Sequence, residues 1–399
     1  MAGQDEIYRR QFLSRMAALS AGVVVAGCAT GETDPAQPSN NKAVQAETPR
    51  PWQPVSDRKL RMGIVGYGEC LFGAAFGFQD HPNVEIVAVS DLVRERREGL
   101  MKACRCDKSY ESLEKLVLDK NLEAVFVATD APSHARHCMD VLRHGKHVLT
   151  AVPAVFGSVE QAQQLLEVVK QAQLNYMMAE TSWYRGDCYA MRQIYKAGGF
   201  GRLVFSEGEY YHYRQTPIPS FRGWRTGMPP LWYPTHSTAY YVGVSAGRLT
   251  SVSCLGSNAG FDAYKPGANK YGNQFTDEIA LYETSEGGSS RMLMCKGVCD
   301  LGAERGRVFG EKGYMDSLHY RGQMKQPVNI LRPALAPGVP KGGHGGSHGY
   351  IAEEFIRSIL QQRQPEVNIY QALALTVPGV IAHESALRDG ERLKIPQFD

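Results

Sequence analysis

The chain of 399 residues is long enough for two domains, and its 43% apolar and 21% charged residues are those of an ordinary folded protein. Its formal net charge of +3 is small and its basic residues are scattered, which argues against a nucleic-acid partner. Twenty tyrosines and four tryptophans supply flat, partly polar rings of the kind that contact carbohydrates. A large core accounts for most of these rings, so the composition indicates no more than a two-domain folded protein.

The N-terminus has the features of an export signal. A twin arginine, Arg9 and Arg10, precedes an apolar run that is too short to span a membrane stably. The sequence VAGC ending at Cys28 resembles a lipobox, in which the cysteine is acylated; simple signal cleavage is the alternative. We predict that residues 1–27 are a Tat-type lipoprotein signal and 28–58 a flexible linker. The protein would then be exported to the periplasm or cell envelope, with Cys28 as its only attachment to a membrane.

A dinucleotide-binding fingerprint follows the linker. The sequence KLRMGIVGYGE is a strand that turns through Gly66 and Gly68, and a second strand, VEIVAVSD, ends in Asp91. Gly66 permits the tight turn, Gly68 lets the backbone approach a pyrophosphate, and Asp91 is placed to bind the adenosine ribose. A carboxylate there repels a 2′-phosphate and favours NAD, although the arginines that follow it leave NADP open. The third glycine of the motif is replaced by Leu71, with Gly73 as the available substitute.

Helix and strand patterns then alternate up to residue 180. Helical patterns cover 112–120, 134–145 and 158–173, and strand patterns cover 122–130, 146–150 and 174–180. This alternation predicts a parallel, doubly wound sheet, so residues 59–180 are expected to form a Rossmann domain. Ligands of such sheets bind at the carboxyl ends of the strands.

Two motifs of this domain resemble one family of sugar dehydrogenases. VATDAPSH, followed by GKHVLTAVP, is similar to the Thr-Pro-x-x-x-His and Gly-Lys-His-Val-x-x-Glu-Lys-Pro patterns of the glucose–fructose oxidoreductase, inositol dehydrogenase and MocA (Gfo/Idh/MocA) family. Ala151 and Val152 replace the Glu-Lys pair, whose lysine lies beside the reacting carbon in that family. The cofactor-binding residues predicted from the fingerprint and this resemblance are Gly66, Tyr67, Gly68, Cys70, Asp91, Thr129, His134, Ala151 and Pro153.

The pattern changes after residue 181 to strand-like runs. These runs cover 201–214, 248–257, 278–284 and 290–297, and helical patterns return at 350–363 and 369–390. Together with the resemblance, they predict an α/β protein whose residues 181–399 form a second domain with an open, mostly antiparallel sheet. We expect this domain to bind substrate and to mediate formation of a homo-oligomer.

Three stretches resemble the family's branch of NAD-dependent α-N-acetylgalactosaminidases. They are AVP at Val152, MMAETSWYRG around Tyr184, and LWYPTHSTA with Tyr233 and His236. The resemblance implies that Tyr184, Tyr233 and His236 are the catalytic groups; histidine can exchange a proton at ambient pH, whereas tyrosine needs help from its surroundings. The residues predicted to contact the sugar are His212, Arg214 and Trp224.

Two other pairs of polar residues are weaker candidates for a functional site. His344 and His348 lie in a glycine-rich loop without a third ligand at a suitable spacing, so we predict no metal site. Glu207 and Glu209 share one strand face and could suggest an ordinary two-carboxylate glycosidase, but the dinucleotide fold favours redox chemistry.

The sequence therefore predicts an NAD-dependent oxidoreductase that acts on a sugar or sugar derivative by hydride transfer at a ring carbon. Two alternatives stay open. The first is a redox-neutral NAD-dependent glycosidase, in which the hydride taken from the sugar is later returned to it. The second is an exported, non-catalytic binding protein that has kept the fold.

Overall fold

The computed structural model describes residues 48–326 and 328–399, so the predicted signal, Cys28 and most of the predicted linker lie outside the described residues. The first sheet has six parallel strands in the order β3-β2-β1-β4-β5-β6. These strands are β1 (Leu60–Val65), β2 (Val84–Ser90), β3 (Ser109–Tyr110), β4 (Ala124–Val127), β5 (His147–Thr150) and β6 (Tyr176–Met178). The strand order reverses direction between β1 and β4, which is where a doubly wound sheet opens a ligand crevice.

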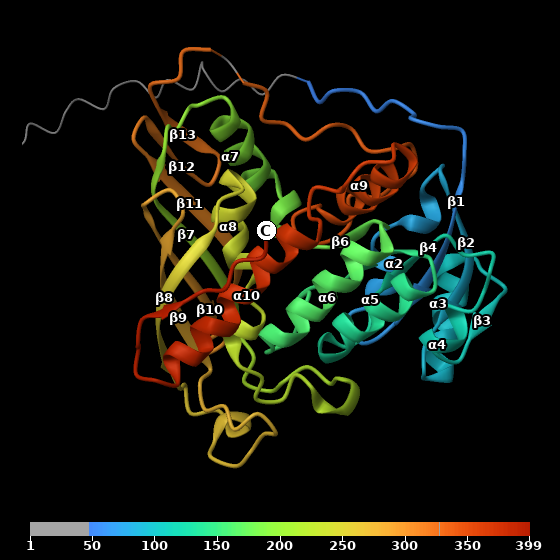
Figure 1. Ribbon diagram of the computed structural model, residues 1–399, viewed down its shortest axis with the longest axis horizontal. Coiled ribbons are helices and arrows are strands. Elements are labelled where there is room, and N and C mark those ends of the chain that lie inside the picture. Colours follow the sequence, from blue (N-terminus) through green and yellow to red (C-terminus); the bar gives the residue numbers. More distant parts are fainter. Residues whose placement is uncertain (1–47, 327) are drawn as a thin grey trace, which may run out of the picture. The chain divides into compact units, whose positions relative to one another are not determined.

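The helices between these strands are amphipathic or buried. They are α2 (Phe72–Ala75), α3 (Arg94–Cys104), α4 (Leu113–Leu116), α5 (His134–Arg143) and α6 (Val159–Ala172). α5 and α6 pack side by side on the sheet (Figure 1). The helix after the glycine turn, α2, is short, because Leu71 and Gly77 flank it with left-handed φ angles of 52° and 74°. A single-turn helix η2 (Phe78–Asp80) follows it.

The second sheet has eight strands in the order β13-β12-β11-β7-β10-β9-β8-β14. Its strands are β7 (Leu203–His212), β8 (Leu249–Ser257), β9 (Asp277–Thr284), β10 (Ser289–Cys295), β11 (Gly302–Gly310), β12 (Gly313–Asp316), β13 (His319–Gly322) and β14 (Leu393–Lys394). The described pairs are antiparallel except for β7 with β10, which is parallel. The α/β fold class and the mostly antiparallel second sheet predicted from the sequence are confirmed.

Helix α8 (Thr235–Ser245) lies directly on this second sheet. A Cβ atom at Gly208 in β7 would stand 2.0 Å from the carbonyl oxygen of Ser237 in α8, so only glycine permits this approach. A Cβ atom at Gly306 in β11 would likewise stand 2.1 Å from the Tyr240 ring. This close packing fixes the start of α8, where His236 is the second residue, relative to the strands below it.

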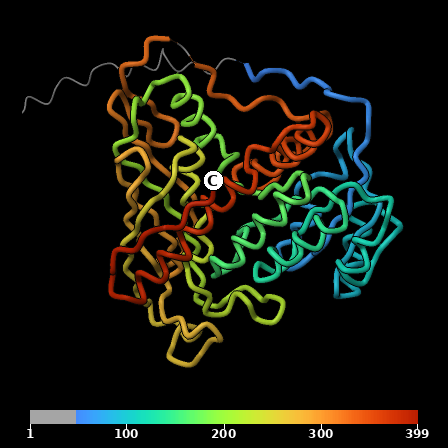
Figure 2. Tube along the Cα trace, in the orientation of Figure 1, coloured from blue at the N-terminus to red at the C-terminus, as the bar shows by residue number. Residues whose placement is uncertain are grey.

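Three further helices complete the fold, and the last of them contacts both sheets. α7 (Gly186–Lys196) packs against α8, and α9 (His348–Leu360) follows the glycine-rich loop. α10 (Ile369–Ala386) contacts β8 of the second sheet and also α6 and β6 of the first, and the red end of the trace shows this course (Figure 2). In the described part of the chain, none of the helices has the length and apolar character needed to cross a membrane.

Candidate active site

Two neighbouring cavities lie at the carboxyl ends of the first sheet. The first has a volume of about 260 Å³ and is lined by the fingerprint residues Gly66 and Gly68, by Asp91 and by Thr129. No side chain crowds Gly68, since a Cβ atom placed there meets nothing within 4 Å. The backbone at this turn is therefore open to a pyrophosphate, as the fingerprint requires. We call this space the cofactor cavity.

Gly73 takes the place of the missing third glycine. A Cβ atom at Gly73 would stand 2.3 Å from the carbonyl oxygen of Gly66 and 3.1 Å from the side chains of Ile64 and Leu100. Glycine is therefore required here for α2 to pack against β1, which is the function of the third glycine in the motif. Leu71, at the expected third position, is exposed.

Asp91 is held in position by the loop around it. Its two carboxylate oxygens accept hydrogen bonds from the backbone N–H groups of Tyr67 at 2.7 Å and Val93 at 2.8 Å. Each oxygen keeps a free lone pair, so the carboxylate can still accept from ribose hydroxyls. The neighbouring arginines are engaged: Arg94 pairs with Glu98, Arg96 pairs with Glu69, and Arg97 donates to the carbonyl oxygen of Asp91. The residues present fit NAD.

The other predicted cofactor residues occupy different places. Tyr67 contributes its backbone to the Asp91 loop, and Cys70 lines both cavities. Buried His134 lies between two carbonyl oxygens, with Nδ1 2.9 Å from Pro153 and Nε2 3.1 Å from Thr129. It therefore ties the end of β4 to the segment after β5 and lines neither cavity, as is also true of Pro153. His137, which the sequence did not single out, lines the cofactor cavity.

The second cavity, of about 330 Å³, adjoins the first, and we call it the substrate cavity. Cys70, Phe72 and Arg225 line both spaces. The predicted site residues that line the substrate cavity are Ala151, His212, Arg214, Tyr233 and His236. Val152 also lines it, so the position of the family's lysine faces this space with an apolar side chain.

His236 is the most strongly organised side chain of the substrate cavity. Its Nδ1 atom lies 2.9 Å from Oε1 of Glu180 and 3.2 Å from the hydroxyl of Thr181. Tyr210 and Tyr233 pack around its ring, with centroid distances of 4.7 and 5.6 Å. Burial alone would lower the pKa of His236, but the carboxylates of Glu180 and Glu304 outweigh it and raise the pKa to about 9. Because Nδ1 is occupied, Nε2 is the nitrogen left for a substrate hydroxyl.

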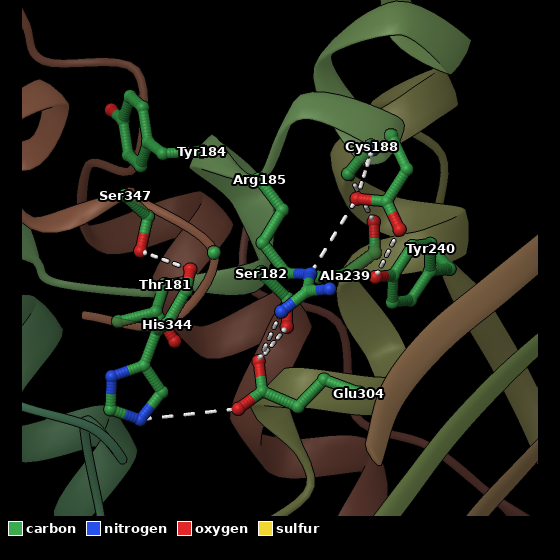
Figure 3. A network of polar contacts seen from close by, with 12 residues as sticks. Thr181, Ser182, Tyr184, Arg185, Cys188, Ala239, Tyr240, Glu304, His344 and Ser347 are labelled. Carbon is green, nitrogen blue, oxygen red and sulfur yellow. Dashed lines mark hydrogen bonds and ion pairs between the residues drawn. The ribbon is translucent and has the colours of Figure 1, made fainter. Parts of the chain in front are cut away.

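A second carboxylate, Glu304 of β11, supports this cluster (Figure 3). It accepts a hydrogen bond from the Ser182 hydroxyl at 3.1 Å, lies 3.7 Å from Nη1 of Arg185, and lies 3.9 Å from Nε2 of His344. His344 in turn lies 2.9 Å from His348 through their ring nitrogens. Burial raises the pKa of Glu304, but His236, His344 and Arg185 together lower it, so this carboxylate stays ionised.

Besides His134 and Pro153, two further predicted site residues lie elsewhere than expected. The Tyr184 ring belongs to the core, its hydroxyl has no hydrogen-bond partner among the described residues, and it does not line the substrate cavity. Figure 3 shows this ring turned away from Glu304 and His344. Burial raises the pKa of Tyr184 well above its ordinary value, which makes it a poor base. Trp224, predicted to contact the sugar, lines the cofactor cavity instead.

Lys296 is a functional candidate that the sequence reasoning missed. It is buried, lines the substrate cavity, and donates through Nζ to the Tyr264 hydroxyl at 2.8 Å and the Met228 carbonyl oxygen at 3.0 Å. Burial lowers its pKa to about 7. The sequence did place this lysine directly after strand β10. Lysines are rarely buried, and a buried lysine beside a cavity is a candidate functional residue. Glu180 likewise comes shortly after strand β6.

No group of three or more metal-binding side chains occurs among residues 48–326 and 328–399. The eight described cysteines are all free thiols. Five of them are buried, Cys295 is partly buried, and Cys70 and Cys299 are exposed.

Comparison with known proteins defines the class of the protein. Residues 60–180 match the family described as "Oxidoreductase family, NAD-binding Rossmann fold". With the second sheet domain, this fold is that of an NAD-binding oxidoreductase. Over residues 60–180 the chain is similar to the Gfo/Idh/MocA family.

Relatives in sequence and in structure agree with this assignment. A glycosyl hydrolase family 109 protein of Saccharopolyspora erythraea is 22% identical, over 100% of this chain and 96% of its own. A second protein of that family, from Akkermansia muciniphila, is 25% identical, over 98% of this chain and 96% of its own.

Two solved structures share the fold. Scyllo-inositol dehydrogenase from Lactobacillus casei has a TM-score of 0.68 and 15% identity, covering 85% of this chain and 99% of that one. Levoglucosan dehydrogenase in complex with NADH has a TM-score of 0.68 and 14% identity, covering 86% of this chain and 100% of that one.

Proposed function

We propose that this protein oxidises a carbohydrate by transferring a hydride from a ring carbon to NAD. The observation that carries the proposal is the shared wall of the two cavities: Cys70, Phe72 and Arg225 line both of them. A sugar in the substrate cavity therefore lies next to the end of a cofactor bound along Gly66, Gly68 and Asp91. NAD, when bound, supplies the hydride acceptor.

The proton chemistry falls to His236. Removal of a hydride from an alcohol carbon requires that the hydroxyl proton leave as well, and a positioned base lowers that barrier. Nε2 of His236 is the acceptor, while Glu180 holds Nδ1 and stabilises the imidazolium that forms. Tyr233 borders the same space and is placed to hydrogen-bond the sugar. Because Val152 replaces the family's lysine, the proton acceptor lies on α8 and not in the segment after β5.

The proposal is tested by His236→Ala. A positioned base contributes about 10²–10⁴-fold to the rate, so the variant should lose at least that much turnover. It should keep bound NAD and a near-parental melting temperature, because His236 lines only the substrate cavity. Retention of more than about a tenth of the parental rate, well above what that range allows, would place the proton chemistry elsewhere.

A redox-neutral NAD-dependent glycosidase is the second candidate. The relatives that align with nearly the whole chain are named glycosyl hydrolase family 109 proteins, which favours this alternative. The same His236–Glu180 pair would then also handle the proton on the neighbouring carbon. Release of an aglycone without accumulation of NADH distinguishes this activity from net oxidation.

We also propose where the protein acts and how it assembles. Arg9, Arg10 and Cys28 support Tat export and a lipid anchor in the cell envelope. At that location, tight retention of NAD would suit the redox-neutral alternative, because the hydride returns to the sugar, whereas net oxidation requires that NADH exchange for fresh NAD. Exposed apolar side chains on the second sheet support a homo-oligomer through that face; they are Val204, Leu255, Ile279, Leu281 and Tyr314.

A further inference from the structure

The formally charged side chains that line the substrate cavity itself are cationic. Three cationic residues line it, Arg214, Arg225 and Lys296, and no aspartate or glutamate does so in the described part of the chain. A site for a neutral sugar commonly places carboxylates and amides against hydroxyl groups, which need acceptors as well as donors. A cleft whose formally charged lining residues are all cations instead concentrates anions.

Among the described residues, no anionic group pairs with the Lys296 ammonium. This ammonium group is buried and its two contacts, Tyr264 and the Met228 carbonyl oxygen, are neutral. An ammonium has three hydrogens to donate, so one remains for a ligand in the cavity that Lys296 lines. A buried charge is costly unless it is paired, and a ligand anion would supply the missing pair.

The carboxylates nearest to Lys296 are already committed elsewhere. Asp277 accepts backbone hydrogen bonds from Lys296 and Gly297, both at 2.7 Å, through Oδ1. Glu278 accepts from the backbone N–H of Leu231 at 2.7 Å and pairs with His383. Both carboxylates act on the Lys296 ammonium only through space, and the effect of burial on its pKa outweighs theirs. Neither can reach into the cavity to neutralise the ammonium.

The two arginines are also without a carboxylate partner among the described residues. The Arg225 guanidinium lies 4.1 Å from the centroid of the Trp224 ring, and its side chain is half-buried at the boundary of the two cavities. Arg214 is exposed, and among the described residues its guanidinium donates to the Tyr213 carbonyl oxygen alone, at 3.2 Å. Guanidinium groups bind carboxylates and sulfates through two parallel hydrogen bonds.

A phosphate of the cofactor does not account for this charge. Arg225 borders both cavities, but Arg214 and Lys296 line only the substrate cavity. Arg214 and Lys296 are therefore available to the substrate and not to the phosphates of the cofactor.

We propose that the substrate of this site is an anionic carbohydrate, a sugar bearing a carboxylate or a sulfate ester, whose oxyanion is bound by Lys296 together with Arg214 and Arg225. The inference rests on the proposed function in assigning a sugar to this cavity, and it narrows the class of sugar.

Matched pairs of ligands test the proposal. The full chain loaded with NAD is titrated calorimetrically with glucuronate and glucose, galacturonate and galactose, mannuronate and mannose, and N-acetylglucosamine 6-sulfate and N-acetylglucosamine. We expect the tightest ligand of the panel to be acidic and to bind at least about tenfold more tightly than its neutral counterpart. The uronate and sulfate arms identify which oxyanion the site prefers.

Substitutions of the lining residues test whether the preference for acidic ligands arises in the substrate cavity. Lys296→Met should weaken the acidic ligand by about thirtyfold or more, since it removes a buried charge, and Arg214→Gln by about threefold, since that residue is exposed. Lys296→Arg should restore most of the acidic preference if Lys296→Met retains NAD and its melting temperature. Lys102→Gln, which removes an exposed cation on α3, should change nothing.

Two results would overturn the proposal. One is equal or tighter binding of the neutral members, and the other is binding of no member at all. Turnover of neutral sugars alone would leave the proposed redox function intact while removing this inference. Tighter binding of the acidic ligands without any NADH formation would support this inference and contradict the proposed redox function.

Discussion

His236 Nδ1 and Glu180 Oε1 lie 2.9 Å apart, and both side chains are buried. They come from different parts of the chain, since Glu180 follows β6 of the first sheet and His236 begins α8 on the second. The contact therefore joins the two sheet domains at the cavity that they share. It also fixes the imidazole so that Nε2 is available to a substrate.

This pair predicts an unusual pH dependence. The carboxylates of Glu180 and Glu304 raise the pKa of His236 to about 9, so the neutral form required of a base increases as the pH rises towards 9. We expect kcat/KM to rise with pH over this range, and Glu180→Gln to move the rise to lower pH. A profile that is flat from pH 6 to 10 in the parent would argue against His236 as the base.

The same pair stabilises the fold in a defined pH window. The pKa of His236 is raised above its ordinary value of 6.5, so the stabilisation is fully present below 6.5 and is lost as the pH rises through about 9. The melting temperature of the parent should exceed that of Glu180→Gln by more at pH 6 than at pH 10. Thermal scans of both proteins at the two values measure the difference.

Two tyrosines near the site should behave differently. Tyr233→Phe removes a hydroxyl from the substrate cavity, and we expect kcat/KM to fall by about tenfold, which corresponds to one lost hydrogen bond of about 1.4 kcal/mol. Tyr184→Phe removes a buried hydroxyl that makes no hydrogen bond with the described residues, so activity and melting temperature should stay near parental values. A large loss of activity in Tyr184→Phe would restore the role that the sequence motif implied.

Much of this architecture could be predicted from sequence because its signals are local. The turn at Gly66 and Gly68 and the carboxylate at Asp91 follow from the spacing of a single strand–turn–strand unit, and the second sheet from its strand-like runs. The partners of His236 could not be predicted in this way. Glu180 and Glu304 are distant from it in sequence, and their approach depends on how α8 packs on β7 through Gly208. Tyr184 was misplaced because a motif fixes position along the chain but not the direction of a side chain.

Asp91 should determine the preference for NAD. Asp91→Ala removes the acceptor for the ribose hydroxyls and should weaken NAD by about 1–3 kcal/mol, or about 5- to 150-fold. NADP affinity should fall less or rise, because a repulsive charge is removed. Asp107→Ala, which removes an exposed carboxylate away from both cavities, is the matched control. Equal weakening of both cofactors would point to a loss of loop structure instead.

Cellular location should depend on three residues near the N-terminus. Cys28→Ser should move the protein from the membrane fraction to the soluble periplasm, because it removes the site of acylation. Changing Arg9 and Arg10 together to lysine should keep the protein in the cytoplasm. Fractionation followed by immunoblotting measures both outcomes. If the variants distribute as the parent does, the export and anchoring proposals fail.

The most direct test of net oxidation is the yield of NADH per molecule of carbohydrate consumed. The purified chain is incubated with excess NAD and a panel of free sugars and nitrophenyl glycosides, while NADH absorbance and released phenol are followed together. We predict that NADH accumulates in a one-to-one ratio with the sugar consumed, and that His236→Ala abolishes this accumulation. Release of phenol with no accumulation of NADH would contradict net oxidation and establish the glycosidase alternative.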